Sequence, residues 1–434
     1  MKNAGCYLFA PGNFFVGYAG GDMRIRSVRA HLLSYVFPQP VRLGYFGGTR
    51  EIVKRDAMLI RVETDNGLVG YGPGEASESA AELIQRTIAP WLEGRVLADA
   101  DALRVQFHAA VKPDLRTAHT YGTLEVALYD LLGKAAGVPV SELLGGRIRD
   151  RIKCYGSAGM YQAPEGYAAE ARLAQEMGFA AYKMRPAAGP EADVAAVRAM
   201  REATGAGFGL MVDGHSWWRM GDRSYSAATV EKVAEGMSAY ELTWLEEPLP
   251  PADHAGYRRL RETGLAPLAT GEHEPSEAGF LDLIEGGCAD YIQMDVVCQG
   301  GYAQARRLFD AVEREGLRFA FHSWGSELEL AAAAQLGVCW PEQVVEWLEY
   351  PLYTGNGRRF MYEFPLAGEM LTEPLPVEAG ELIVPRGPGL GVKVNELVLT
   401  RYPWVSGPWS YFTLISPPGR FAVTGDHANT GLHP

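Results

Sequence analysis

Eight short apolar segments recur at regular intervals from residue 151 onward, and this regularity constrains the fold more than any other feature of the sequence. Each has the length of a strand, and an alanine-rich stretch with helical character separates it from the next. The segments begin near residues 151, 180, 209, 243, 267, 291, 318 and 344, so one strand, one helix and two short loops fit each interval. Eight such units predict an α/β fold with a closed parallel barrel, and a doubly wound open sheet is the competing topology.

The stretches between the strands carry boundary signals of helices. The sequence "PEGYAAEARLAQEMG" begins with Pro164 and ends at Gly178, and "SEAGFLDLIEGG" begins with Ser276 and ends on glycines. Proline favours the first turn of a helix, serine caps its N-terminus and glycine follows its C-terminus. Both stretches are therefore predicted to be helices that cover the barrel.

The segments on either side of the barrel have a different pattern. Residues 24–150 begin with two alternating stretches, which predict antiparallel strands with a turn at Asp65-Asn66-Gly67, and helical stretches follow. We therefore expect an α+β domain over residues 24–150, the barrel over 151–350, and an N-terminal extension over 1–23. Residues 351–434 are rich in proline and glycine and predict an irregular covering. Its tail, from about residue 404, is expected to pack over a sheet edge or contact a partner subunit.

Composition excludes several classes of function. The chain of 434 residues has a formal net charge of -13, which argues against a general attraction to nucleic acid or an anionic membrane. No apolar run reaches the roughly 18 residues of a membrane span. The cysteines are scattered, without a C-x-x-C pair, and predict reduced thiols of a cytoplasmic protein rather than a disulfide framework or a zinc site. They are Cys6, Cys154, Cys288, Cys298 and Cys339.

Ionisable residues close seven consecutive strands of the predicted barrel. In a parallel barrel these strand ends open on one face, where catalytic groups gather. Residues i and i+2 of a strand share a face, so Lys183 and Arg185 point the same way and require an anion to offset their charge. The residues are Lys183, Arg185, Asp213, His215, Glu246, Glu247, Glu272, Asp295, His322, Glu346 and Glu349.

Three carboxylates from neighbouring strand ends predict a metal site. Asp213, Glu246 and Glu272 would converge, and like charges this close repel strongly unless a cation lies between them. Oxygen ligands with room for water and substrate favour Mg²⁺ over Zn²⁺. The alternative is that each carboxylate pairs with a lysine or arginine of the barrel.

The spacing of these motifs resembles the enolase superfamily. The sequence "VDG", "LEEP" 33 residues later and "TGE" another 26 residues on resemble its metal-binding strand ends, and "ALYDLLGKAAGVPVSELLGG" resembles its junction segment. The pair "QMDVVCQGG" and "FHSWGS" resembles the Asp-His dyad of the mandelate racemase subgroup. The resemblance covers residues 24–395 and implies a modified (β/α)7β TIM-like barrel. It also implies an N-terminal α+β capping domain to which the C-terminal segment returns.

The resemblance also implies roles for the strand-end residues. Members bind a carboxylate substrate on Mg²⁺, here held by Asp213, Glu246 and Glu272, and remove the proton beside the carboxylate. Lys183 and Arg185 would face that carboxylate and the enediolate it becomes, since a dianion must be stabilised. His322 would be the base and Asp295 would orient its imidazole. Glu349, or alternatively Glu346, would hydrogen-bond the substrate carboxylate. Glu247 would contact the metal ligands without binding the metal itself.

Two departures from the subgroup pattern bear on the reaction. Racemases of the subgroup carry K-x-K, and the second lysine is a base, whereas this sequence has Arg185, which stays protonated. Many members carry asparagine where this chain has His215, and the resulting D-x-H resembles the subgroup's acid-sugar dehydratases, in which the histidine acts as acid. A contact behind the metal, or a hydrogen bond to a substrate hydroxyl, is the alternative role of His215.

These features predict a Mg²⁺-dependent lyase that dehydrates an aldonate or aldarate to a 2-keto-3-deoxy acid. A racemase or epimerase is the alternative, and a non-catalytic binder is a third reading.

The stretch 37–50 is expected to be a mobile loop that closes over the site, and Trp217, Trp218 and Arg219 are expected to pack against the polyol. The alternative for the stretch 37–50, and for the segment that holds Trp217, Trp218 and Arg219, is that it packs on an oligomer surface. We further expect a cytoplasmic homo-oligomer whose partner is a small carboxylate, with no nucleic acid and no membrane.

Overall fold

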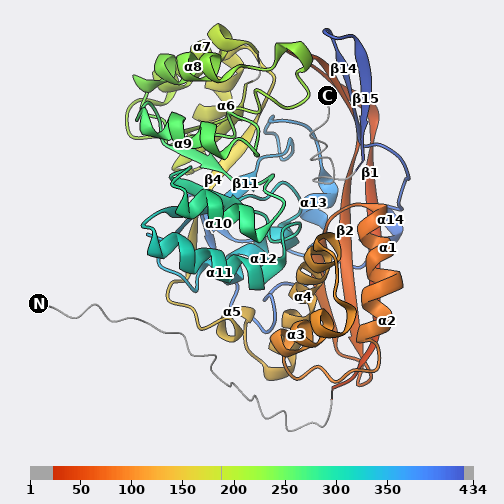
Figure 1. Cartoon of the computed structure of the whole chain (residues 1–434). Coiled ribbons are helices and arrows are strands. Elements are labelled where there is room, and N and C mark those ends of the chain that lie inside the picture. Colours follow the sequence, from red (N-terminus) through yellow and green to blue (C-terminus); the bar gives the residue numbers. More distant parts are fainter. Residues whose placement is uncertain (1–22, 187, 425–434) are drawn as a thin grey trace, which may run out of the picture.

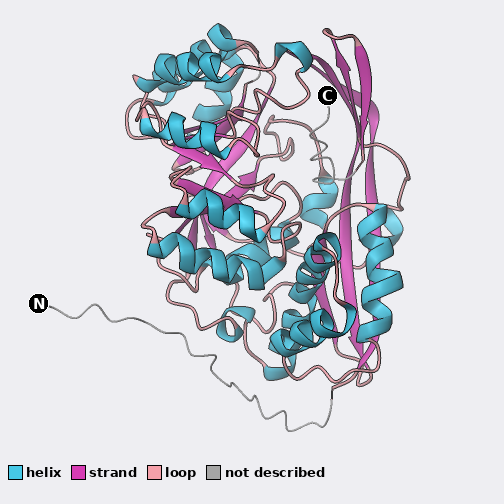
Figure 2. Ribbon diagram, viewed as in Figure 1, coloured by secondary structure: helices cyan, strands magenta, loops and turns pink. Residues whose placement is uncertain are grey.

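Eight parallel strands close into a barrel (Figures 1 and 2). In this computed structural model, which describes residues 23–186 and 188–424, the strands pair in sequence order and the last pairs with the first, Glu349 beside Tyr155. The predicted closed barrel is therefore confirmed over the open sheet. The strands are β4 (Arg151–Met160), β5 (Ala181–Arg185), β6 (Gly209–Asp213), β7 (Trp244–Glu246), β8 (Leu268–Thr270), β9 (Tyr291–Met294), β10 (Arg318–Phe321) and β11 (Val345–Pro351).

Seven long helices connect the barrel strands. Two of them begin where the sequence predicted: Pro164 opens α6, and the side chain of Ser276 caps α10 by accepting a hydrogen bond from the Gly279 amide. After β11 the chain is irregular up to the short α13 (Pro365–Glu369), so the barrel has the predicted (β/α)7β form. The connecting helices are α6 (Pro164–Glu176), α7 (Pro190–Thr204), α8 (Ala227–Ser238), α9 (His254–Glu262), α10 (Glu277–Glu285), α11 (Gly301–Arg314) and α12 (Glu327–Gly337), with a 3₁₀ turn, η2 (Gly221–Arg223), before α8.

A buried layer of side chains fills the barrel and forms the floor of its mouth. Each strand contributes one residue to this layer, and large and small side chains are mixed around the ring. Because strand residues alternate between faces, the residues two positions further on also point inward, and these include Lys183, Asp213, Glu246, His322 and Glu349. The layer consists of Tyr155, Ala181, Met211, Trp244, Ala269, Tyr291, Ala320 and Trp347.

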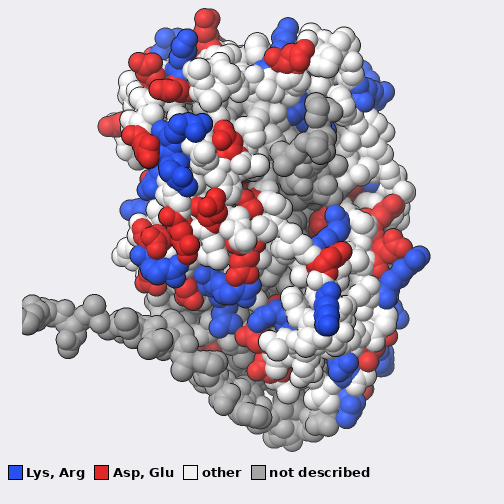
Figure 3. Space-filling model, viewed as in Figure 1, with Lys and Arg blue, Asp and Glu red and all other residues white. Residues whose placement is uncertain are grey.

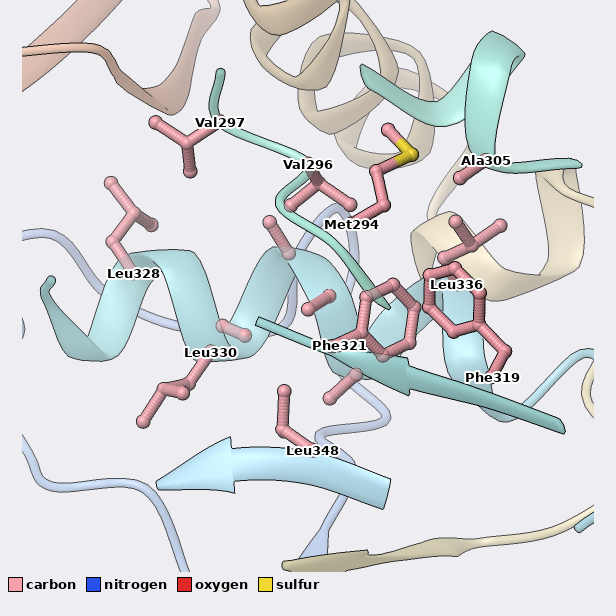
Figure 4. Close-up of a cluster of buried hydrophobic side chains, with 14 of the residues drawn as sticks. Met294, Val296, Val297, Ala305, Phe319, Phe321, Leu328, Leu330, Leu336 and Leu348 are labelled. Atoms are coloured by element: carbon pink, nitrogen blue, oxygen red, sulfur yellow. The ribbon is translucent and has the colours of Figure 1, made fainter. Parts of the chain in front are cut away.

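The outer faces of β10 and β11 are held by α12. Figure 4 shows Phe319 and Phe321 of β10 close to Leu336 of this helix, with Leu348 on the neighbouring strand. All four are fully buried, and the two phenylalanine rings lie 5.0 Å apart between centroids. Burial of such side chains stabilises by about 1.5–3 kcal/mol each, so the strand that leads to His322 is firmly anchored.

The second layer is an antiparallel sheet that stands beside the barrel (Figure 1). Its strands are β1 (Ile25–Tyr45), β2 (Gly48–Thr64), β3 (Val69–Gly74), β14 (Ser410–Leu414) and β15 (Gly419–Val423), in the order β1-β2-β14-β15 with β3 also on β2. Its helices are α1 (Glu78–Leu83), the π-helix η1 (Ile84–Ile88), α2 (Ala89–Leu92), α3 (Ala100–Val111), α4 (Leu115–Ala136) and α5 (Val140–Leu143). Among the described residues, no helix combines the length and apolarity that a membrane crossing requires.

The stretch 37–50 is not the loop that the sequence predicted. It forms the end of β1 and the start of β2, with Leu43 opposite Arg50 and a tight turn at Phe46 and Gly47. Its glycines and aromatic residues suggested a loop, but the hairpin is paired on both sides of the two prolines at 38 and 40, and an irregularity in the pairing between Val36 and Val41 accommodates them. This part of the capping domain is therefore a paired hairpin.

The C-terminal segment contacts both layers. Strand β13 (Glu381–Ile383), paired with the short β12 (Val377–Glu378), lies antiparallel to β4, where the sequence predicted irregular covering. After α14 (Val398–Arg401), β14 pairs with β2, so this part of the tail packs over a sheet edge as expected. Cys154, Cys288 and Cys339 are free thiols, and Cys6 lies outside the described residues, as do residues 1–22 of the predicted extension and the last ten residues. The domain boundaries themselves remain a prediction.

Asp130 on α4 joins three segments that are distant in the sequence. Its Oδ2 accepts hydrogen bonds from the Tyr71 amide at 2.8 Å and Lys134 Nζ at 2.6 Å, and its Oδ1 accepts one from the Leu390 amide at 2.8 Å. Asp130→Ala would leave one buried and one partly buried amide without an acceptor, and we expect the free energy of unfolding to fall by about 3 kcal/mol. Urea denaturation measures the change. Asp101→Ala removes a more exposed ion-paired carboxylate and should cost less than about 1 kcal/mol, and an equal loss in both variants would contradict the prediction.

Candidate active site

The three candidate metal ligands converge at the mouth of the barrel. Asp213 ends β6 and is paired directly with Glu246 at the end of β7, while Glu272 follows β8 by two residues. Each offers a carboxylate oxygen, and these oxygens all lie within 4.8 Å of one another. All three side chains are buried. The geometry is therefore that of a compact acidic centre.

The two cations of β5 are paired with these carboxylates. Lys183 Nζ lies 2.5 Å from Glu246 Oε1 and 3.0 Å from Glu349 Oε1. The guanidinium of Arg185 donates through Nε and Nη2 to Asp213 Oδ2, the Nε bond being 2.9 Å long. Burial alone would lower the pKa of Lys183, but the carboxylates raise it above its usual value. The anions required by Lys183 and Arg185 are thus the strand-end carboxylates.

The donor set fits a hard divalent cation despite these pairings. Asp213 Oδ1 and Glu272 Oε2 are buried and accept no hydrogen bond, although imidazole nitrogens lie 3.1 Å from each. Burial raises the pKa of Glu246 to about 8, which reflects the cost of charge at this position. Mg²⁺ prefers oxygen ligands, and the three carboxylates present such oxygens within 4.8 Å of one another. Asp213, Glu246 and Glu272 could therefore hold such an ion after small side-chain adjustments.

The predicted dyad is in place. His322 follows β10, and its Nδ1 lies 3.1 Å from Asp295 Oδ2. Asp295 is itself fixed, because its Oδ1 accepts a hydrogen bond from the Val297 amide at 2.6 Å. The other nitrogen, Nε2, faces Glu272 Oε2 at 3.1 Å. Burial opposes a charge on the ring, but Glu272, Glu349 and Asp295 together raise the pKa of His322 to about 10.

His215 lies on the opposite side of the same carboxylate. Its Nε2 is 3.1 Å from Glu272 Oε1, and its Nδ1 is 3.1 Å from Asp213 Oδ1. The backbone at His215 has a φ of 39°, a left-handed conformation that non-glycine residues rarely adopt, and Glu247 has the same feature with a φ of 38°. Such strained positions concentrate at functional sites.

Glu349, rather than its competitor Glu346, lies at the mouth. Glu349 contacts Lys183, and its Oε2 accepts a hydrogen bond from the Ser323 amide at 3.1 Å. Glu346 is near the start of β11 and binds Arg318 Nη1 at 2.5 Å, at the opposite end of the barrel. The alternative assignment to Glu346 is therefore wrong.

His273 belongs to the site and was missed from the sequence. Its Nδ1 lies 2.6 Å from Glu247 Oε2 and 3.3 Å from Glu272 Oε1. Burial opposes its charge, yet Glu247 raises its pKa to about 9. Strand alternation would have placed His273 on the face opposite Glu272, but β8 ends at Thr270 and alternation does not apply to the loop. The only available signal was the run of charged residues in "GEHE".

The loop after β6 is bound to the capping sheet. Trp217 donates its Nε1 hydrogen bond to the Glu247 carbonyl at 3.0 Å. Trp218 packs edge-on against Phe412 of β14 with 4.9 Å between ring centroids, and the Arg219 carbonyl accepts a hydrogen bond from Tyr45. The two tryptophans are partly buried, so the packing of Trp217, Trp218 and Arg219 against a polyol remains a prediction.

The fold and the site together define a capped barrel with a buried acidic centre and an imidazole–carboxylate pair. Residues 166–398 match the family model for the enolase C-terminal domain-like fold, and residues 40–145 match the N-terminal domain of mandelate racemase and muconate lactonizing enzyme. The chain therefore belongs to the enolase superfamily and to its mandelate racemase subgroup. Relatives of the chain are named as enzymes.

Relatives include two that are named for sugar-acid reactions. An L-rhamnonate dehydratase of Saccharopolyspora erythraea is 32% identical over 371 residues, which cover 80% of this chain and 85% of the relative. A D-galactarolactone cycloisomerase of Agrobacterium fabrum is 27% identical over 391 residues, 88% of this chain and 99% of the relative. The crystal structure of an enolase superfamily member from Polaromonas sp. JS666 is 28% identical, with a TM-score of 0.76 and coverage of 89% and 99%.

Proposed function

We propose that the protein is a Mg²⁺-dependent sugar-acid dehydratase that converts an aldonate or aldarate to a 2-keto-3-deoxy acid. The observation that carries the proposal is the pair of imidazoles on Glu272. His322 Nε2 lies 3.1 Å from one of its oxygens and His215 Nε2 lies 3.1 Å from the other. Dehydration needs a base and an acid close to one substrate, and this arrangement supplies both.

In this proposal His322 removes the proton from carbon 2 of the substrate. A cation bound by Glu272 would offset the negative charge that otherwise favours the protonated ring. Asp295 holds Nδ1, so Nε2 is the nitrogen that accepts the proton. His215 then gives a proton to the departing hydroxyl of carbon 3, which leaves as water, and the enol tautomerises to the 2-keto acid. Lys183 supplies positive charge beside the carboxylate as negative charge develops there. Mg²⁺ held by Asp213, Glu246 and Glu272 would neutralise further negative charge at the carboxylate.

The ion pairs that Arg185 and Lys183 of β5 form with carboxylates argue against the alternative of a two-base racemase or epimerase. Arg185 is bound to Asp213, which offsets the effect of burial and raises the pKa of the guanidinium above its usual value. Lys183 is likewise held protonated by Glu246 and Glu349. Neither group is suited to accept a proton from the other face of the substrate. Cycloisomerisation stays a second candidate because the Agrobacterium fabrum relative is named for it.

We expect turnover to depend on a divalent cation and to release a 2-keto acid. The purified protein is incubated with a panel of aldonates and aldarates in buffer with Mg²⁺, and 2-keto acid is assayed. Removal of the ion with EDTA should abolish turnover, and added Mg²⁺ should restore it. In deuterated water, exchange of the α-proton without 2-keto acid would refute dehydration in favour of epimerisation. The homo-oligomeric state and the cytoplasmic location proposed from the sequence are separate questions for solution scattering and fractionation.

A further inference from the structure

Arg50 is a buried cation whose charge no described carboxylate offsets. It lies on β2 with 4% of its surface exposed, and its Nε donates a 3.1 Å hydrogen bond to the Ser410 hydroxyl. Its guanidinium carbon is 4.8 Å from the ring centroid of Trp409 and 4.9 Å from that of Phe412. No carboxylate of the described residues forms an ion pair with it. A buried charge without a counter-ion is costly, so such an arrangement calls for an anionic ligand.

Some other arginines donate their hydrogen bonds to backbone carbonyls. On the face shown in Figure 3, acidic and basic side chains are interspersed over the barrel helices. The partly buried Arg149 donates to the carbonyls of Gly337 and Val345, and Arg201 donates to that of Phe208. Within residues 23–186 and 188–424, Arg50 has neither a carboxylate nor a carbonyl partner. In a chain with a formal charge of -13, such a buried arginine points to a binding role.

The position of Arg50 connects it to the site. Its guanidinium carbon lies 5.6 Å from the centroid of the Trp218 ring, and that ring lies 5.6 Å from the ring of His215. Arg219 lies against the same tryptophan at 5.9 Å, and its Nε is buried without a hydrogen-bond partner. Arg50 therefore flanks the site at some distance from the acidic centre.

A second buried polar group near Arg50 also lacks a partner. The hydroxyl of Tyr362 is buried and makes no hydrogen bond, and only 4% of the residue is exposed. Burial lowers the pKa of Arg50, whereas Tyr161 and Tyr362 oppose that shift and Arg185 adds to it. Among the described residues, a buried guanidinium whose hydrogen-bond partner is a neutral serine, together with a hydroxyl donor that has no partner, suits an anionic oxygen group.

We propose that Arg50, aided by Arg219, binds a second anionic group at the end of the substrate remote from carbon 1. This inference rests on the proposed function and makes it more specific: the site takes sugar acids with a charged far end in preference to aldonates with a neutral hydroxymethyl end. A carboxylate, as in an aldarate, and a phosphate monoester share the required chemistry. Charge-assisted bonds from a guanidinium suit either group.

The test compares sugar acids that differ only at the far end. With Mg²⁺ present, kcat/KM is measured for galactarate against galactonate, glucarate against gluconate, and gluconate against 6-phosphogluconate, and calorimetry gives the dissociation constant of each acid in parallel. We expect the charged acid to be preferred at least 30-fold in kcat/KM or in affinity, about the effect of hydrogen bonds to a charged group. Preference for the aldarate or for the phosphate identifies the source of the anion. Equal or tighter use of the neutral-ended acids would overturn the inference.

Substitution of Arg50 shows whether this residue is responsible. Arg50→Gln is expected to lower the ratio of charged to neutral substrate at least tenfold, with Arg50→Lys intermediate as a variant that keeps the charge. Arg42→Gln is the matched control, because Arg42 lies on the same hairpin, pairs with Glu51 at 2.8 Å and has 77% of its side chain exposed. A ratio unaltered by Arg50→Gln would reject the assignment. Turnover of neutral-ended acids alone would contradict this inference. If no acid gives 2-keto acid or exchanges its α-proton, the proposed function is contradicted. In that case the dissociation constants from calorimetry still decide whether Arg50 binds the charged end.

Discussion

Replacement of His322 by asparagine is expected to lower kcat/KM for sugar-acid turnover by about 10²–10⁴-fold, the usual contribution of a positioned general base. Asparagine keeps a polar side chain of similar reach but cannot accept the proton. The exchange of the substrate α-proton in deuterated water should fall by the same factor, because the proposed base acts before the hydroxyl leaves. Asp295→Asn should have a smaller effect, since Asp295 orients the ring through its 3.1 Å contact with Nδ1.

The control for His322 is another imidazole held by carboxylates. His254 on α9 lies 2.5 Å from Asp282 Oδ2 through Nδ1 and 3.2 Å from Glu274 Oε2 through Nε2, away from the acidic centre. His254→Asn should leave kcat/KM within about twofold of the wild-type value, as expected for a site away from the chemistry. Proton exchange that persists in His322→Asn would assign the base to another residue, and Lys183 would then be the first to test.

The barrel could be predicted from the sequence because its signals are local and repeated. Each strand from β4 to β11 begins within about one residue of its predicted start, since apolar runs, caps and glycines recur with every unit. The capping sheet was harder to predict from the sequence. Its strand β1 continues through Pro38 and Pro40, and β14 pairs with β2 across more than 340 residues of sequence. Such long-range pairing leaves no local pattern.

The candidate site was predictable where it follows strand geometry. Lys183, Asp213, Glu246 and His322 each lie two residues beyond a residue of the buried layer, and alternation alone places them inside the barrel mouth. Glu247 and His273 depend on loop conformation, and Glu247 adopts a φ of 38° that no residue pattern announces. Arg50 has no signal in the sequence, because the role proposed for it depends on the absence of a carboxylate partner among the described residues around it.

Replacement of Lys183 by methionine is expected to impair both stability and turnover. The Lys183 ammonium is 1% exposed and offsets Glu246 and Glu349, which are both fully buried. Methionine fills much of the same space but leaves two carboxylates without a shared cation. Removal of one partner from such a buried cluster costs about 3–5 kcal/mol. Loss of the positive charge beside the substrate carboxylate should lower kcat by a further 10²–10³-fold, about the effect of removing one electrostatic donor.

The loss of stability in Lys183→Met should depend on pH in a direction set by the carboxylates. Burial already raises the pKa of Glu246 to about 8, and removal of the ammonium raises it further. A carboxyl whose folded pKa exceeds its unfolded value near 4.5 binds more protons when folded, so the free energy of unfolding falls as pH rises through that interval. Urea denaturation without divalent cations should therefore show a larger deficit relative to wild type at pH 8 than at pH 5. Lys153→Met, which removes a partly exposed lysine beside Glu342 and Glu346, should cost less than about 1 kcal/mol. A deficit in Lys183→Met that is the same at pH 5 and pH 8 would mean that lost packing, rather than uncompensated charge, destabilises the variant.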